Sequence, residues 1–257
     1  MAVTASVDHG IGWITLDKPP ANSYDRDFIA ELGGAIDELA ADDAAKVVVV
    51  RSASEKFFSA GADVKNFADS DADTNNAMVA FAHEVFDKLG SIDKLTIAAI
   101  NGHALGGGYE IALACDTRIA AEGRYRIGLP EVTLGLLPGT GGTQRLPRLI
   151  GRGRALLMMA TGQSVTPDEA ERLGMIDRVV PADELLDHVT EVATTIANGA
   201  PLAIAATKRA VHRGADLELA EGLRIELEEL APLFASEDGA EGMAAFLEKR
   251  APDYRGR

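Results

Sequence analysis

Short apolar segments alternate with amphipathic ones along the first part of the chain. Residues 3–7 and 11–16 alternate in polarity around Asp8-His9-Gly10, which predicts a β-hairpin. Residues 47–50 and 95–100 are continuous apolar runs, a pattern typical of strands that are buried on both faces. This arrangement predicts strands that are separated by helices, and therefore a mixed α/β fold.

Helices are predicted from apolar periodicity and from capping residues. An apolar stripe predicts a helix that ends near residue 40, with Ser23 or Asp25 as its cap: Phe28, Leu32, Ile36 and Leu39. Thr166-Pro167-Asp168-Glu169 combines a capping box with a proline at the first helical position, and this helix ends at Gly174. Between and after them we expect a polar loop at 69–76, helices at 77–89 and 154–160, and a strand at 176–180.

The pattern changes near residue 200, because only helical segments follow. They are predicted near residues 183–198, 201–212, 217–231 and 237–250, with prolines between them. No low-complexity tract or linker marks the change. We therefore divide the chain into an α/β core over residues 1–199 and a C-terminal helical region over residues 200–257.

Composition narrows the class of partners. The 257 residues contain 25 Lys and Arg against 40 Asp and Glu, a net charge of −15, which disfavours nucleic acids and anionic membranes as partners. The single cysteine, Cys115, excludes an intrachain disulfide and is expected to be a buried, inert thiol. The first 13 residues lack the features of a signal peptide, and no apolar run approaches 18 residues, so a cytoplasmic protein is expected.

The stretch from Asn101 to Arg145 carries the candidate chemistry. Gly106-Gly107-Gly108 leads into an apolar segment with Glu110 in its first turn, and Glu131 follows Pro130 further along. A glycine run at a helix start lets a ligand approach unpaired amides, which suit an oxygen that gains negative charge. Glycine runs also occur where helices simply pack closely on strands, and first-turn glutamates are common. The combination with a second acid in apolar surroundings favours a site that joins an oxyanion hole to acid/base chemistry.

The sequence motifs of several other catalytic and binding sites are absent from the chain. Neither Gly106–Ile111 nor Gly139–Gln144 has the third glycine of a dinucleotide fingerprint, and no phosphate loop occurs. No serine lies in a G-x-S-x-G elbow, and the five histidines have no metal-binding spacing. What remains is a glutamate pair with main-chain donors, without a metal or an organic cofactor.

Three blocks, FFSAGADVK, NGHALGGGYEIALACD and LPEVTLGLLPGTGGTQRLPRLIG, occur in an order that resembles the enoyl-CoA hydratase/isomerase (crotonase) family. The resemblance extends over essentially the whole chain. It implies an α/β spiral of β-β-α turns with a C-terminal helical region that assembles homotrimers, often paired into hexamers. It also implies an acyl-CoA thioester as substrate, with coenzyme A as part of that substrate and no separate cofactor.

The resemblance implies roles for individual residues. Ala62 and Gly107 match the two main-chain donors of the oxyanion hole, while Glu110 and Glu131 match the two acid/base residues. Positions that match the substrate- or CoA-binding segments are Ala60, Asp63, Lys65 and Lys249, the last of which serves the CoA of a neighbouring subunit.

The presence of both glutamates favours hydration of a trans-2-enoyl-CoA in acyl-chain degradation. Family members that only shift a double bond usually keep an acid at the Glu131 position alone. The alternative to hydration is the activity of another family member, an isomerase, a hydrolase or a lyase. A third possibility is a non-catalytic protein that binds acyl-CoA. The chain departs from the usual family pattern at Asn22-Ser23-Tyr24-Asp25 and at Asn66-Phe67. Tyr109, where small residues are common, is expected to narrow the acyl pocket.

Overall fold

The computed structural model describes residues 1–257. Its larger sheet has the strand order β1-β2-β3-β5-β7-β10, in which β1 and β2 are antiparallel and the other pairs are parallel. The strands of this sheet are β1 (Val3–Asp8), β2 (Ile11–Leu16), β3 (Val47–Ser52), β5 (Leu95–Ile100), β7 (Thr117–Ala121) and β10 (Arg178–Val180). The predicted hairpin and the predicted buried strands are confirmed.

A smaller sheet carries the other strands in the order β4-β6-β8-β9. They are β4 (Phe57–Ser59), β6 (His103–Leu105), β8 (Ile127–Gly128) and β9 (Ser164–Val165). The chain passes repeatedly from a strand of the larger sheet to a strand of the smaller one and then into a helix: β3 precedes β4, β5 precedes β6, and β7 precedes β8. This repetition makes the chain a spiral of β-β-α turns.

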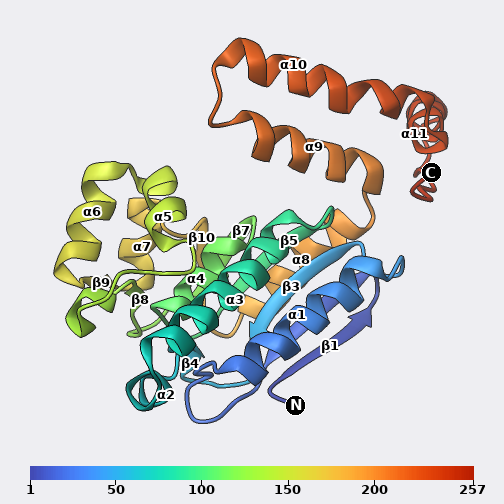
Figure 1. Cartoon of the computed structure of the whole chain (residues 1–257). Coiled ribbons are helices and arrows are strands. Elements are labelled where there is room, and N and C mark those ends of the chain that lie inside the picture. Colours follow the sequence, from blue (N-terminus) through green and yellow to red (C-terminus); the bar gives the residue numbers. More distant parts are fainter.

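Helices cover the larger sheet and extend the spiral. α1 (Arg26–Ala41) and α3 (Ala72–Ser91) lie in front of the sheet in Figure 1, and α8 (Leu185–Ala197) lies behind it. The remaining helices of this part are α2 (Val64–Asp69), α4 (Gly107–Ala114), η1 (Glu131–Leu134), α5 (Gly142–Ile150), α6 (Arg152–Thr161) and α7 (Pro167–Leu173). None of the helices is both long enough and apolar enough to cross a lipid bilayer.

Capping side chains decide where several helices begin. Asp25 accepts a hydrogen bond from the Phe28 amide at 3.0 Å, and Thr166 caps α7 as predicted. The predicted loop at 69–76 is wrong, since α3 already begins at Ala72. Asp71 caps this helix by accepting from the Thr74 amide at 2.7 Å, and the first turns of α3 face solvent, where polar side chains are compatible with a helix.

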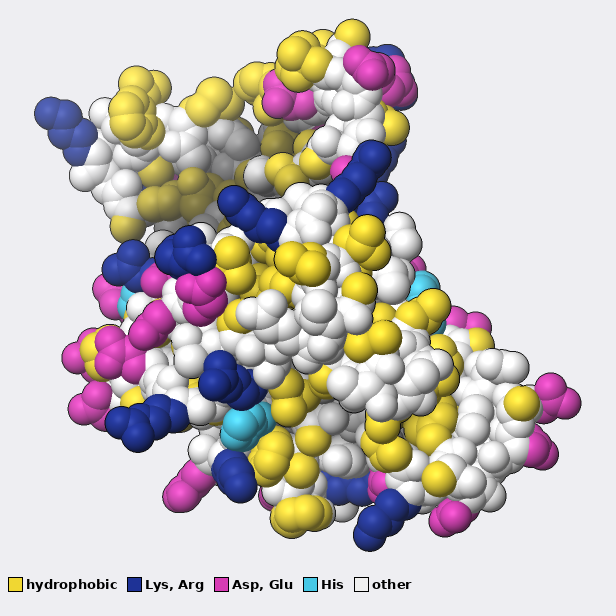
Figure 2. Space-filling model, turned by 90° about the vertical axis from the view of Figure 1, so that its left-hand side faces the viewer, with side chains coloured by type: hydrophobic (Ala, Val, Ile, Leu, Met, Phe, Trp, Pro, Cys, Tyr) yellow, Lys and Arg dark blue, Asp and Glu magenta, His cyan; other side chains and the backbone are white.

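The C-terminal helices stand away from the sheets (Figure 1). They are α9 (Pro201–Gly214), α10 (Leu219–Leu230), η2 (Ala231–Ala235) and α11 (Glu237–Glu248). A buried ion pair joins α9 to the core, because Lys208 Nζ lies 2.8 Å from Asp116 Oδ2. Apolar side chains gather on the outside of this upper part of the molecule (Figure 2), and they include Leu219, Leu227, Phe234, Phe246 and Leu247.

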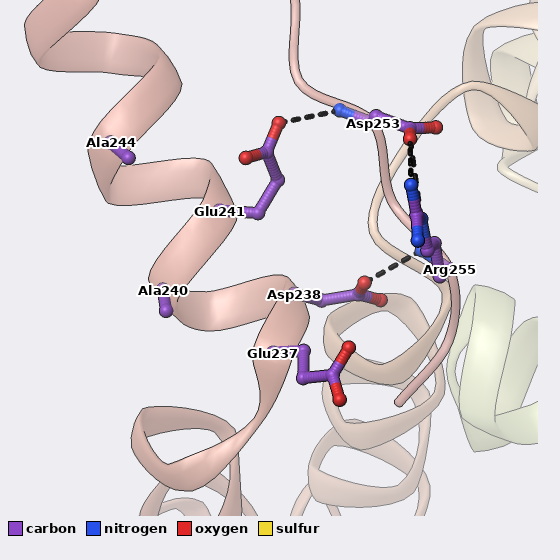
Figure 3. A pocket seen from close by; sticks show the side chains of 7 residues that line it. All are labelled: Glu237, Asp238, Ala240, Glu241, Ala244, Asp253 and Arg255. Atoms are coloured by element: carbon purple, nitrogen blue, oxygen red, sulfur yellow. Dashed lines mark hydrogen bonds and ion pairs between the residues drawn. The ribbon is translucent and has the colours of Figure 1, made fainter.

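The C-terminal tail folds back onto α11 (Figure 3). Asp238 accepts hydrogen bonds from the amides of Arg255 at 2.7 Å and Gly256 at 2.8 Å, and Glu241 accepts from the amide of Asp253 at 2.8 Å. Asp238 and Glu241, which line the pocket between α11 and the tail in Figure 3, therefore hold the tail against the helix. Lys249 ends α11 in the left-handed conformation, with φ 57°.

Candidate active site

Three neighbouring parallel strands bring the separated sequence blocks together. β4 pairs with β6 and β6 pairs with β8, both in parallel, so the chain leaves all three strands at the same edge of the smaller sheet. The segment after β4 contains Ala62, the segment after β6 contains Gly107 and Glu110, and the segment after β8 contains Glu131. The carboxyl edge of parallel strands is where ligands bind in many α/β proteins.

The two predicted oxyanion-hole segments lie in contact. Gly61 has φ +84°, a conformation that suits glycine, and a Cβ added to it would lie 2.9 Å from the nitrogen of Gly107. The amides of Ala62 and Gly107 donate to no acceptor in the turns, loops and helix caps. Gly107 is also the first residue of α4, so its amide has no acceptor within the helix. These two main-chain N–H groups lie on neighbouring segments, and both are therefore free to donate to the oxygen of a ligand.

Close packing fixes the start of α4 against β4. A Cβ added to Gly108 would lie 2.1 Å from the carbonyl oxygen of Ser59, a distance that no side chain tolerates. Ser59 is itself fully buried, and its hydroxyl accepts from the Gly61 amide at 3.1 Å and donates to the Asn22 carbonyl at 2.8 Å. The helix start and the Gly61 turn are thus held in one arrangement by the same serine.

Glu110 is buried, with 2% of the residue exposed, and its carboxyl is hydrogen-bonded on both oxygens. Oε1 accepts from the amides of Thr140 at 2.9 Å and Gly142 at 2.7 Å, and Oε2 accepts from the Thr140 hydroxyl at 2.5 Å. Burial raises the pKa of Glu110, and these three hydrogen bonds oppose the rise. The loop before α5 therefore orients this carboxyl.

Glu131 lies in a different environment. Both carboxyl oxygens are buried, and neither receives a hydrogen bond from another residue. A Cβ added to Gly106 would lie 3.0 Å from its Oε1, so the carboxyl lies over the turn that leads into α4. Burial, together with the charge of Glu110, raises the pKa of Glu131 to about 7. The raised pKa favours the protonated carboxyl up to near neutral pH.

The predicted CoA-contacting positions divide between two places. Ala60 and Asp63 lie on the segment that contains Ala62, between β4 and α2, and Lys65 is the second residue of α2. Asp63 caps α2 by accepting from the Lys65 amide at 3.0 Å, and the Lys65 side chain is exposed. Lys249 is the C-cap of α11, which lies away from α4 within one chain (Figure 1).

Three residues at this site were not predicted from the sequence. Thr140 and Gly142 donate hydrogen bonds that orient the Glu110 carboxyl. They belong to the Gly139–Gln144 segment, whose sequence only excluded a dinucleotide-binding fingerprint. Tyr24 is the third, because a Cβ added to Gly107 would lie 1.9 Å from its hydroxyl oxygen. The glycine-rich composition of the Thr140 loop was the available signal for two of them.

Tyr109 is the residue expected to narrow the acyl pocket. Its side chain is fully buried, and its hydroxyl donates to the Met175 carbonyl at 2.8 Å. Cys115 is buried as predicted, and burial raises the pKa of its thiol to about 12. No group of three or more His, Cys, Asp and Glu side chains could hold a metal ion.

Comparison with known proteins identifies the class. Residues 6–257 match the family described as Enoyl-CoA hydratase/isomerase. The chain is 43% identical to a probable enoyl-CoA hydratase of Mycobacterium tuberculosis, covering 97% of this chain and 96% of the relative. It is 39% identical to a short-chain-enoyl-CoA hydratase of Clostridium acetobutylicum, covering 92% of this chain and 91% of the relative. A crystal structure of a Geobacillus kaustophilus protein titled as an enoyl-CoA hydratase superposes with a TM-score of 0.96 at 43% identity, covering 100% of this chain and 97% of that one.

The protein therefore belongs to the enoyl-CoA hydratase/isomerase (crotonase) family and has the crotonase fold. The resemblance inferred from the three sequence blocks and the fold class it implied are confirmed.

Proposed function

We propose that this protein is an enoyl-CoA hydratase that adds water across the 2,3-double bond of a trans-2-enoyl-CoA. The observation that carries the proposal is the pair of glutamates with buried carboxyls, Glu110 and Glu131, together with two unpaired amides. The names of the relatives assign hydration of enoyl-CoA to those proteins, and identities near 40% over almost the whole chain support the same reaction here.

The amides of Ala62 and Gly107 bind the thioester carbonyl oxygen. Water can attack C3 only if the negative charge that develops on this oxygen is stabilised, and in other enzymes the loss of one such donor costs roughly 3–4 kcal/mol of barrier. The two donors belong to main chain that is already fixed by Ser59, so they need no rearrangement when the charge appears.

The two carboxyls take complementary roles because their environments differ. Glu110 is fixed by three hydrogen bonds that favour its ionised form, so it takes a proton from the attacking water. Glu131 holds its proton up to about pH 7 and delivers it to C2. A C3–O bond and a C2–H bond form, one O–H bond of water and the O–H bond of Glu131 break, and the electron pair of the double bond ends in the new C2–H bond. Glu110 holds the proton from water, and Glu131 takes up a proton from solvent as Glu110 releases its own, which restores the site.

We place the CoA moiety along the segment after β4. Ala60 and Asp63 flank the oxyanion turn, and the exposed Lys65 side chain supplies a cation for a phosphate in a chain whose net charge is −15. Lys249, in the C-terminal helices, contacts the CoA of a neighbouring subunit. Coenzyme A is part of the substrate, and we propose no other cofactor and no metal.

The C-terminal helices supply the surface for assembly. We propose that residues 200–257 form an oligomerisation region and residues 1–199 the catalytic core. Exposed apolar side chains on α10, η2 and α11 form a surface that a second copy can cover, and a homotrimer or a hexamer of two trimers meets this need.

The reaction is tested by the loss of enoyl-thioester absorbance when crotonyl-CoA or longer enoyl-CoAs are added. We expect Glu110→Gln and Glu131→Gln each to lower kcat at least about 100-fold, while both variants still bind butyryl-CoA, which has no double bond to hydrate. Glu122→Gln, at an exposed position, is the control and should keep full activity. Unchanged turnover in Glu110→Gln would rule out this mechanism and favour double-bond isomerisation.

A further inference from the structure

Tyr24 is attached to the oxyanion turn through its main chain. Its amide donates to the Gly61 carbonyl at 2.9 Å, and its carbonyl accepts from the Asp63 amide at 2.9 Å. These two hydrogen bonds flank Ala62, whose amide is free. Tyr24 therefore keeps a fixed position relative to the proposed oxyanion hole.

Aromatic packing then fixes the direction of the Tyr24 side chain. The residue is 5% exposed. Its ring meets the ring of Phe86 edge-on, with centroids 5.8 Å apart, and lies 6.4 Å from the ring of Phe28. Such contacts leave the ring little freedom to rotate away from the site.

The hydroxyl of Tyr24 lies at the start of α4. It occupies the space where a Cβ of Gly107 would lie, at 1.9 Å, so it touches the main chain of the second oxyanion donor. Burial raises the pKa of Tyr24, the charges of Glu110 and Glu131 raise it further, and hydrogen bonding with the Thr140 side chain opposes the rise, so the phenol stays neutral. The hydroxyls of Tyr109 and Tyr125 donate to main-chain carbonyls, whereas that of Tyr24 donates to none.

The bonds already made by Glu110 leave one place for water. Its Oε1 accepts two amides and its Oε2 accepts the Thr140 hydroxyl, so one acceptor position of Oε2 remains. A water molecule bound there has a second hydrogen that needs an acceptor in a buried site. The neutral Tyr24 oxygen, which lies against Gly107 three residues before Glu110 on α4, can accept it.

We propose, on the basis of the hydration reaction proposed above, that Tyr24 is a positioning residue that holds the attacking water beside Glu110. One hydrogen of the water points to Glu110 and is transferred to it. The other points to the Tyr24 oxygen and stays on the new hydroxyl group of the product. Tyr24 keeps its own proton throughout.

The test compares kcat and KM for crotonyl-CoA in Tyr24→Phe and in Tyr109→Phe. Tyr24→Phe removes the hydroxyl but keeps the ring between Phe28 and Phe86, so we expect kcat to fall about tenfold while KM and butyryl-CoA affinity stay within about twofold. Tyr109→Phe removes a buried hydroxyl that bonds Met175, and it should keep kcat within about twofold. Tyr24→Leu also lacks the hydroxyl and must lose at least as much kcat, which keeps the test available if Tyr24→Phe does not fold.

The outcomes separate this inference from the proposed function. If the wild-type protein does not hydrate any enoyl-CoA, the proposed function fails. If the wild type hydrates crotonyl-CoA and the Tyr24 variants keep kcat within about twofold, only the role of Tyr24 is overturned. An equal loss of kcat in Tyr24→Phe and Tyr109→Phe also overturns it, because both losses would then reflect disturbed packing.

Discussion

Replacing Glu131 by glutamine tests whether its carboxyl is a buried charge that destabilises the fold at neutral pH. The side chain keeps its shape, while the ionisable group is lost. Because neither oxygen of Glu131 receives a hydrogen bond from another residue, little structure depends on the carboxylate itself. We therefore expect the variant to lose hydration activity and to gain stability, which is the trade-off found where active sites store unfavourable charge.

The magnitude follows from the pKa of Glu131, which is raised from 4.5 to about 7. The native state binds this proton more tightly than the unfolded chain, so the free energy of unfolding falls as pH rises from about 4.5 to about 7 and stays low above that. Each pKa unit corresponds to about 1.4 kcal/mol. Glu131→Gln should therefore be more stable than the wild type by about 3 kcal/mol at pH 8, and by less than about 1 kcal/mol at pH 5.

Urea unfolding at pH 5 and pH 8, at matched protein concentrations, measures this difference. Glu122→Gln is the control, because Glu122 is exposed and its replacement should change stability by less than about 0.5 kcal/mol at either pH. No gain in stability at pH 8, or a gain of the same size at both pH values, would refute the claim that burial raises the pKa of Glu131.

Three other predictions address the site. Because Glu131 acts as the acid, kcat/KM for crotonyl-CoA should fall about tenfold per pH unit above about pH 7; a flat profile from pH 6 to 9 would contradict this. Thr140→Val removes the hydroxyl that donates to Glu110 Oε2 and should lower kcat about tenfold with KM within about threefold, whereas an unchanged kcat would show that the two amides suffice. Gly108→Ala places a Cβ 2.1 Å from the Ser59 carbonyl oxygen and should destabilise the protein by about 3 kcal/mol in urea unfolding. Its control is Gly34→Ala in α1, where a Cβ meets nothing within 4 Å and should add stability; equal effects of the two changes would count against the packing argument.

The proposed mechanism assigns two different roles to the same residue type. Glu110 and Glu131 both lie where apolar residues surround them, and burial raises the pKa of each. Only Glu110 is enclosed by a loop that donates three hydrogen bonds, and these favour its charged form. The proposed base and the proposed acid therefore differ in the environment of their carboxyls and not in residue type.

Strands and helices could be predicted because their signals are local or lie in compact motifs. The apolar runs at 47–50 and 95–100 identify buried strands directly, and Thr166 marks the start of α7. The start of α3 was missed because Asp71 caps a helix whose first turns are polar and exposed, a composition that also suits a loop.

Contacts between distant segments could not be predicted in the same way. Thr140 reaches Glu110 across 30 residues of sequence, and this contact depends on how the chain returns after β8. Tyr24 reaches Gly107 only because the bridge to Ala62 attaches it to the oxyanion turn. The direction of the Tyr109 side chain depends on Met175, which lies in another turn of the spiral. Spacing within one segment carries no information on such contacts.

The most direct test of the proposed reaction is mass spectrometry of the products formed from crotonyl-CoA in water enriched in oxygen-18. Hydration by Glu110 and Glu131 predicts an intact CoA thioester with one oxygen-18 atom in a new hydroxyl at C3, and no such product from Glu110→Gln. A rearranged enoyl-CoA without oxygen-18, or free CoA with oxygen-18 in a released carboxylate, would contradict it, since those products belong to isomerisation and to thioester hydrolysis.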